Sequence, residues 1–163
     1  MIKKNVLARF ATIIAAGSLF VSAALPQAYG RDGIGFGAIV GEPTGVSVKY
    51  WLDQTTAFDA ACAWSLTDNS PFQLHADYLI HGSSLTTSSS EIKGSLPWYY
   101  GIGGRVKNIN NKSHIGVRVP VGVTYLLAEA PIDIFGEITP VLDLKPSINL
   151  NWNAAIGVRY YFH

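Results

Sequence analysis

The sequence predicts an all-β protein whose residues 31–163 form an eight-stranded antiparallel up-and-down transmembrane β-barrel. Two observations support this prediction. Beyond residue 30, strict alternation of apolar with small or polar residues recurs in segments of roughly ten residues, the length that a tilted strand needs to cross a bilayer. Charged residues make up only 14% of the chain, against about 25% in typical soluble domains. Too few charges are therefore available to cover a water-facing surface.

Residues 1–30 have the composition of a cleaved secretory signal peptide, with a basic start, an apolar stretch over 10–25 and small residues near the end. Residues 28–30 favour cleavage before Arg31; cleavage after Ala24 and an uncleaved anchor are the alternatives, although the apolar stretch is short for a spanning helix. This segment holds three of the 12 basic residues and no acid, which leaves nine basic and 11 acidic residues. Without a basic patch, nucleic acid is excluded as a partner.

The first four strands are expected at residues 33–40, 46–52, 58–66 and 72–81. Glycine, proline, asparagine and aspartate mark the turns between them, at Gly41–Gly45, Asp53–Gln54 and Asp68–Pro71. A Ser/Thr-rich connection, residues 82–95, follows the fourth strand. If both chain ends are periplasmic, this longest connection is periplasmic too, whereas long loops of such barrels usually lie outside.

The last four strands are expected at residues 98–107, 115–125, 132–142 and 152–162. Residues 108–113 and 143–150 form two of their connections. The seventh strand alternates least regularly, and the eighth recovers the pattern up to Phe162, which His163 follows. Eight is an even number of antiparallel strands that can close into a barrel.

Residue size decides which face of the strands is outside, because a soluble lipocalin-type barrel alternates in the same way with its apolar face inward. Here the polar face consists of Gly, Ala, Ser and Thr with a few nearly balanced charges, which suits a narrow interior. The apolar face carries no charge, and a Lys or Arg at the bilayer midplane would cost roughly 2–4 kcal/mol. The predicted interior polar network is Lys49, Asp59, His75, Asp77, Arg105, Lys107, Arg118, Asp133, Glu137 and Arg159.

Aromatic residues gather near the ends of the expected strands, as in the interfacial girdles of membrane barrels. The predicted girdle comprises Tyr50, Trp51, Trp64, Phe72, Trp98, Tyr99, Tyr100, Tyr125, Trp152, Tyr160 and Phe162.

The turn at residues 41–45, the strand segment 98–105 and the ending 156–162 resemble those of small eight-stranded bacterial outer-membrane barrels of the OmpA-transmembrane-domain and OmpX type. The resemblance extends over residues 31–163. It implies the same fold, a place in the bacterial outer membrane, and outer-membrane lipids and the barrel assembly machinery as partners. It implies no particular activity, so a non-enzymatic structural or surface-interaction role in the cell envelope is expected.

Two other functions stay open. His75, Asp77 or His81 with Ser83 or Ser84 could serve a lipid-modifying barrel enzyme, but one strand cannot supply a catalytic triad by spacing alone. A His75–Asp77 pair inside the polar network is the simpler interpretation. The second alternative is a soluble periplasmic binder of apolar ligands.

Neither a metal nor a cofactor is expected. His75, His81 and His114 show no metal-ligand spacing. Cys62, the single cysteine, is interpreted as a small apolar residue. No small-molecule ligand and no catalytic residue is predicted.

Overall fold

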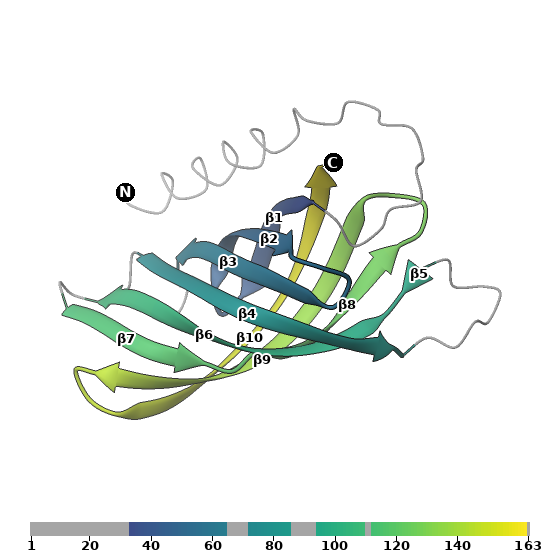
Figure 1. Cartoon of the computed structure of the whole chain (residues 1–163). Helices are drawn as coiled ribbons and strands as arrows, with labels where there is room; N and C mark the ends of the chain where they lie inside the picture. Colours follow the sequence, from purple (N-terminus) through teal and green to yellow (C-terminus); the bar gives the residue numbers. More distant parts are fainter. Residues whose placement is uncertain (1–32, 65–71, 86–93, 110–111, 163) are drawn as a thin grey trace, which may run out of the picture.

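The computed structural model describes residues 33–64, 72–85, 94–109 and 112–162 (Figure 1). These residues form ten antiparallel strands and no helix, which confirms the predicted all-β antiparallel class. The strands are β1 (Ile34–Gly41), β2 (Thr44–Trp51), β3 (Thr56–Trp64), β4 (Phe72–Ser84), β5 (Gly94–Ser95), β6 (Pro97–Ile109), β7 (Lys112–Arg118), β8 (Val121–Leu127), β9 (Ile132–Lys145) and β10 (Asn149–Phe162). The predicted signal peptide lies outside the described residues. In the described part of the chain, no helix is long and apolar enough to cross a membrane.

The ten strands form one closed ring. β1 pairs with β2 on one side and with β10 on the other, and β10 also pairs with β9. Between them the order runs through β3, β4 and β6, and then β7 and β8 fill the space between β6 and β9. Closure gives most strands a hydrogen-bonding neighbour on both sides, which removes the open edges of a flat sheet.

The structure has ten strands instead of the predicted eight because β5 forms within the predicted connection 82–95, and because the predicted strand 115–125 is interrupted. Leu96 separates β5 from β6, and Val119 with Pro120 separates β7 from β8. Pro120 has no amide hydrogen and cannot donate to the ladder, although its carbonyl accepts a hydrogen bond from Gly101. The pairing of β5 and β6 with β7 and β8 keeps one register across both breaks, as in the pairs Gly94–Leu127, Tyr100–Val121 and Gly103–Arg118.

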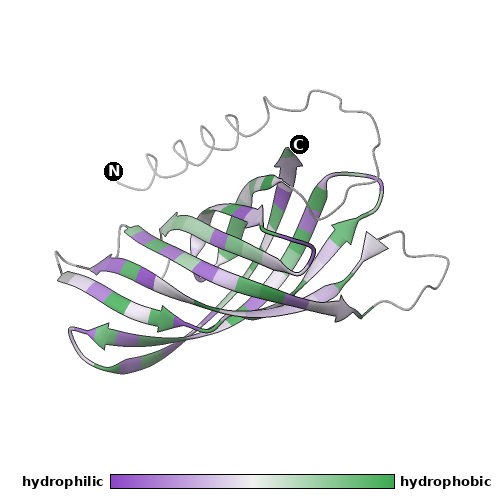
Figure 2. Cartoon of the chain, viewed as in Figure 1, coloured by the Kyte–Doolittle hydropathy of each residue, from purple (hydrophilic) through white to green (hydrophobic). Residues whose placement is uncertain are grey.

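Alternate residues of each strand point into and out of the ring. On β10, Asn153, Ala155, Arg159 and Tyr161 are buried, while Ala154, Ile156 and Val158 on the opposite face are exposed, Ile156 to 66%. Figure 2 shows the corresponding alternation of hydropathy along the strands. Charged and polar side chains therefore lie inside the ring and large apolar side chains cover its outside, the reverse of a soluble ligand-binding barrel.

The wall of the ring has unequal height. β1 and β2 have eight residues each, whereas β9 and β10 have 14 each. Residues 143–150 were expected to form a loop, but β9 and β10 continue pairing as far as Asp143 and Asn149. In Figure 1 the β6–β7 and β9–β10 hairpins extend beyond the β1–β2 hairpin. Antiparallel order puts the connection after β4 at the same end of the ring as the start of β1 and the end of β10.

Candidate functional site

The interior polar network is the most distinctive chemical feature of the ring. Of the ten predicted members, nine are buried, and the side chain of the tenth, Glu137, is only 8% exposed. Small interior residues make room for these long side chains. Gly103 is an example, because a Cβ atom there would collide with the carboxylate of Asp77. The network divides into three arginine-centred clusters and one lysine-centred cluster.

The first cluster surrounds Arg159, which is 2% exposed. Its guanidinium donates to the carboxylates of Asp59 and Asp133 and to the hydroxyl of Ser47, and its Cζ atom lies 3.8 Å from the ring centre of Phe135. The hydroxyl of Tyr161 also donates to Asp133, at 2.6 Å. One cation thus holds two carboxylates that would otherwise be buried without a counter-charge.

The second cluster surrounds Arg118, which is 1% exposed. Its Nε donates to both oxygens of Asp77 at 3.0 Å, and its Nη2 donates to Glu137 at 3.0 Å. Tyr99 and Thr139 donate hydroxyl hydrogens to the same Glu137 carboxylate. Such charge-assisted hydrogen bonds are the strong ones in a medium without water.

The third cluster is smaller and lies nearer the tips of the long hairpins. Arg105 makes a forked contact with Asp143, at 2.7 Å for the closest pair of atoms, and Asn151 donates to the same carboxylate. Asp143 was not among the predicted interior residues, because residues 143–150 were expected to form a loop. The signal was present, since Asp143 continues the spacing of two that places Thr139 and Val141 inside the ring.

The fourth cluster corrects the predicted aromatic girdle. Trp51 and Tyr99, expected on the outside, are 3% and 1% exposed and lie inside the ring. The ammonium of Lys49 is 4.4 Å from the Trp51 ring centre and 5.4 Å from that of Tyr99. It donates to Nε2 of His81 at 2.9 Å, and Nδ1 of His81 then donates to the carbonyl of Thr55 at 3.1 Å. Strand alternation puts Trp51 on the same face as Lys49, which outweighs its place near a strand end.

His75 and Lys107 are both buried as predicted. The expected His75–Asp77 pair does not form, because Arg118 takes the carboxylate of Asp77. Among the described residues, Nδ1 of His75 has no hydrogen-bond partner. The interior face was therefore predicted correctly, but the partner was not.

The other girdle residues that can be described face outward to different extents. Tyr125 and Tyr160 are half-buried, and the side chain of Trp64 lies outside the described residues. Two pairs of girdle residues near the end where β1 begins pack against each other, Trp98 stacked on Tyr100 with ring centres 5.6 Å apart and Tyr160 edge-on to Phe162 with ring centres 4.9 Å apart. The exposed members are Tyr50, Phe72, Trp98, Tyr100, Trp152 and Phe162.

The candidate catalytic residues His81 and Ser84 make hydrogen bonds to the polar network and to the backbone. Both ring nitrogens of His81 are engaged, by Lys49 and by Thr55. The hydroxyl of Ser84 accepts from the amide of Leu96, and Ser83 is exposed. Across the described ranges, no group of three or more His, Cys, Asp and Glu side chains could hold a metal ion.

The β2–β3 turn contains an aspartate, Asp53, whose carboxylate closes the turn. The carboxylate of Asp53 accepts hydrogen bonds from the amides and hydroxyls of Thr55 and Thr56, at 2.6–2.8 Å. The hydroxyl of Thr56 contributes most to lowering the pKa of Asp53 below its ordinary value, followed by the amide and hydroxyl of Thr55. An aspartate that closes a turn in this way favours its ionised form.

Comparison with known proteins adds no relative: no family model, no curated protein and no solved structure matches the chain.

Proposed function

We propose that this chain is a non-enzymatic integral protein of the bacterial outer membrane, with a structural or surface-interaction role in the cell envelope. The observation that carries the proposal is the inverted distribution of side chains. Arg118, Arg159 and Lys49 are nearly inaccessible inside the ring, while residues such as Ile102, Ile138 and Ile156 are 58–66% exposed on its outside. This distribution is favourable in hydrocarbon, because apolar surface left in water forgoes about 25 cal/mol of hydrophobic stabilisation per Å².

Strand dimensions support a membrane-spanning ring on its taller side. The outward-facing apolar residues of β10 run from Leu150 to Phe162. At about 3.4 Å per residue and a tilt of roughly 40°, this stretch covers about 30 Å of thickness, enough for the roughly 25 Å apolar band of such barrels. The aromatic residues near the start of β1 suit the boundary between hydrocarbon and headgroups.

Continuity of register supports an eight-stranded barrel in spite of the ten hydrogen-bonded segments. β5 with β6 and β7 with β8 then each count as one strand with a local interruption. The interior of an eight-stranded barrel is just wide enough for side chains to fill. With arginines paired across it, we expect a filled barrel that conducts no large solutes, and we expect the outer-membrane lipids and the barrel assembly machinery to be its partners.

The test is gel mobility of the protein extracted from outer membranes, with and without boiling. A closed barrel stays folded in detergent without heating, so we expect a heat-dependent change of mobility and recovery in the outer-membrane fraction. Recovery as soluble periplasmic protein with no mobility change would contradict the proposal and favour a soluble binder. Lipid A mass spectra from cells with and without the protein should be identical; a protein-dependent mass change would instead assign a lipid-modifying enzyme.

A further inference from the structure

The low side of the wall leaves a polar notch beside β10. The amide of Glu42, in the β1–β2 turn, donates to the carbonyl of Ala154. Beyond this bond, the segment Asn149–Asn153 pairs with β9 alone. The interior of the ring is therefore open laterally beside Asn149–Asn153, beyond the β1–β2 turn.

The notch has a volume of about 230 Å³ and a mostly polar lining that includes the cations Arg105 and Lys107, the carboxylates Glu42 and Asp143, and the amide Asn153. Asn153 is only 6% exposed, and among the described residues its Nδ2 has no hydrogen-bond partner. A buried donor without an acceptor is costly, so a ligand oxygen at this position would be favourable. Cationic Arg105 and Lys107 line the same notch, although Asp143 already binds Arg105.

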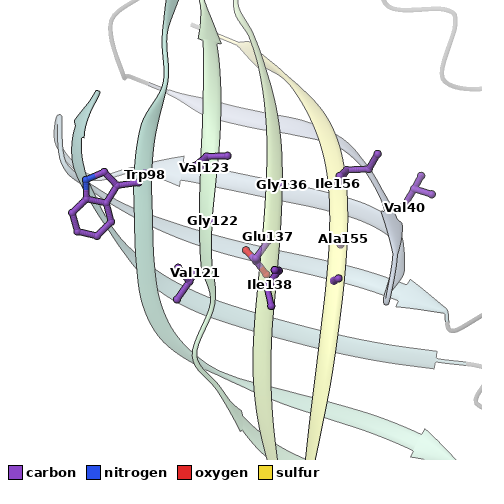
Figure 3. A pocket seen from close by; sticks show the side chains of 11 residues that line it. Val40, Trp98, Val121, Gly122, Val123, Gly136, Glu137, Ile138, Ala155 and Ile156 are labelled. Atoms are coloured by element: carbon purple, nitrogen blue, oxygen red, sulfur yellow. The ribbon is translucent and has the colours of Figure 1, made fainter. Parts of the chain in front are cut away.

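An apolar groove lies on the outside of the ring, over β8, β9 and β10 (Figure 3). Its volume is about 700 Å³, and it extends from Trp98 to Val40. Gly136 lines it between the paired residues Val123 and Ile156. A Cβ on Gly136 would have its nearest neighbour at 3.9 Å, so the absence of a side chain keeps the groove open without being required by the backbone.

The groove and the notch meet at the β1–β2 turn, where the wall of the ring is lowest. Val40 lines the groove, and Glu42, two residues later, lines the notch. On the neighbouring strand, Ala154 lines the groove and Asn153 lines the notch. An amphiphile could therefore place an acyl chain outside and a polar headgroup inside without crossing an intact strand pair.

We propose that a membrane phospholipid binds here, with an acyl chain in the Gly136 groove and its phosphate in the Asn153 notch. This site rests on the proposed membrane location, since only there would the groove face acyl chains. A phosphate supplies the acceptor oxygens that Asn153 lacks and a negative charge beside the cations of the notch. The groove alone would accept any apolar chain, so the notch is what selects a phosphate-bearing headgroup.

The test uses the full protein in a phosphate-free maltoside detergent, titrated with dimyristoyl phosphatidylglycerol and followed by native mass spectrometry. We expect one lipid to bind preferentially. Gly136→Leu should weaken binding by at least about tenfold, since its side chain excludes roughly two or more methylenes of the lipid from the groove. The matched control is Gly104→Leu, at an exposed glycine of β6 that also has open space around a Cβ; its affinity should equal that of the unsubstituted protein.

A second variant tests the part of the site that binds the headgroup. Asn153→Ala should weaken binding, and dimyristoyl glycerol, which lacks the phosphate, should bind equally to Asn153→Ala and to the unsubstituted protein. Thr124→Val is the control, because among the described residues the buried hydroxyl of Thr124 also has no hydrogen-bond partner, yet Thr124 does not line the notch.

Heat-dependent mobility of each sample separates the two proposals. A sample without it would overturn the membrane barrel itself. Folded samples in which Gly136→Leu and Asn153→Ala bind lipid as well as their controls would overturn the lipid site alone, and so would lipid-independent dimers that Gly136→Leu abolishes, which would assign the groove to a second copy of the chain.

Discussion

The Arg159 and Arg105 clusters use the same ion-pair chemistry at two levels of one interior. Arg159 lies inside the complete wall and binds two carboxylates, a hydroxyl and an aromatic face. Arg105 lies beside the notch and binds one carboxylate, which is itself shared with Asn151. The Arg159 cluster therefore cannot lose a member without leaving a buried charge unpaired, whereas the Arg105 cluster has polar side chains and the solvent of the notch close by. Interior position, more than pair geometry, should set the energetic importance of each arginine.

Removing Arg159 should have the largest effect. Arg159→Met leaves Asp59 and Asp133 buried without their cation, and we expect the free energy of unfolding to fall by about 3–5 kcal/mol. Urea unfolding in lipid vesicles, followed by tryptophan fluorescence, measures the change. An unfolding midpoint equal to that of the unsubstituted protein would contradict the greater energetic importance of Arg159.

The Arg118 cluster should come next. Arg118→Ala or Glu137→Ala should each lower the unfolding free energy by about 3 kcal/mol. The first removes the cation from Asp77 and Glu137, and the second removes the acceptor of the Tyr99 and Thr139 hydroxyls and one of the two carboxylates of Arg118. The same unfolding assay checks both variants. Unchanged midpoints for both would refute the interior network as a source of stability.

A charge on the outside tests the opposite face. Ile102→Arg, at a position 60% exposed and away from the notch, should destabilise the protein by roughly 2–4 kcal/mol in lipid. Ile102→Gln is the uncharged control and should cost less. Equal stability of Ile102→Arg and the unsubstituted protein would mean that water, not hydrocarbon, surrounds β6.

The Arg105 cluster should be weaker. Arg105→Ala should cost about 1–2 kcal/mol, because Asn151 and water entering the notch can still solvate Asp143. A loss as large as that of Arg159→Met in the same assay would show that the opening in the wall does not relieve buried charges.

The smallest effect concerns the Asp53 turn. Because its pKa is lower in the folded protein, ionised Asp53 stabilises the fold at neutral pH, and this contribution is lost as pH falls below the ordinary aspartate pKa. Asp53→Asn should therefore be less stable than the unsubstituted protein at pH 7 and equally stable at strongly acidic pH. A stability difference that does not change with pH would contradict this role.

Strand alternation predicted which side chains turn inward, because a period of two assigns a face without knowledge of the neighbours. It placed Lys49, Asp59 and Arg159 correctly, and it would have placed Trp51 and Tyr99 correctly had their position near strand ends not been given more weight. It could not predict that Arg118, not His75, holds Asp77. Contacts across a ring depend on the stagger between strands far apart in the sequence.

The alternation pattern also did not predict the unequal height of the wall. The β1–β2 turn was recognised from its glycines and proline, but the continuation of β9 and β10 through Asp143 and Asn149 was read as a loop. Without the extra length of these strands, neither the notch nor its relation to the outer groove could be anticipated.

The single native cysteine offers the most direct test of the central claim that hydrocarbon surrounds the ring. Cys62 shares the outward face of β3 with Phe58, which is 52% exposed. A spin label on Cys62 in lipid vesicles should be relaxed more strongly by oxygen than by a water-soluble nickel chelate, and a label on Ala128→Cys, at an exposed position of the β8–β9 connection in a Cys62→Ser background, should show the opposite. Stronger relaxation by the nickel chelate at Cys62 would contradict the membrane-embedded barrel.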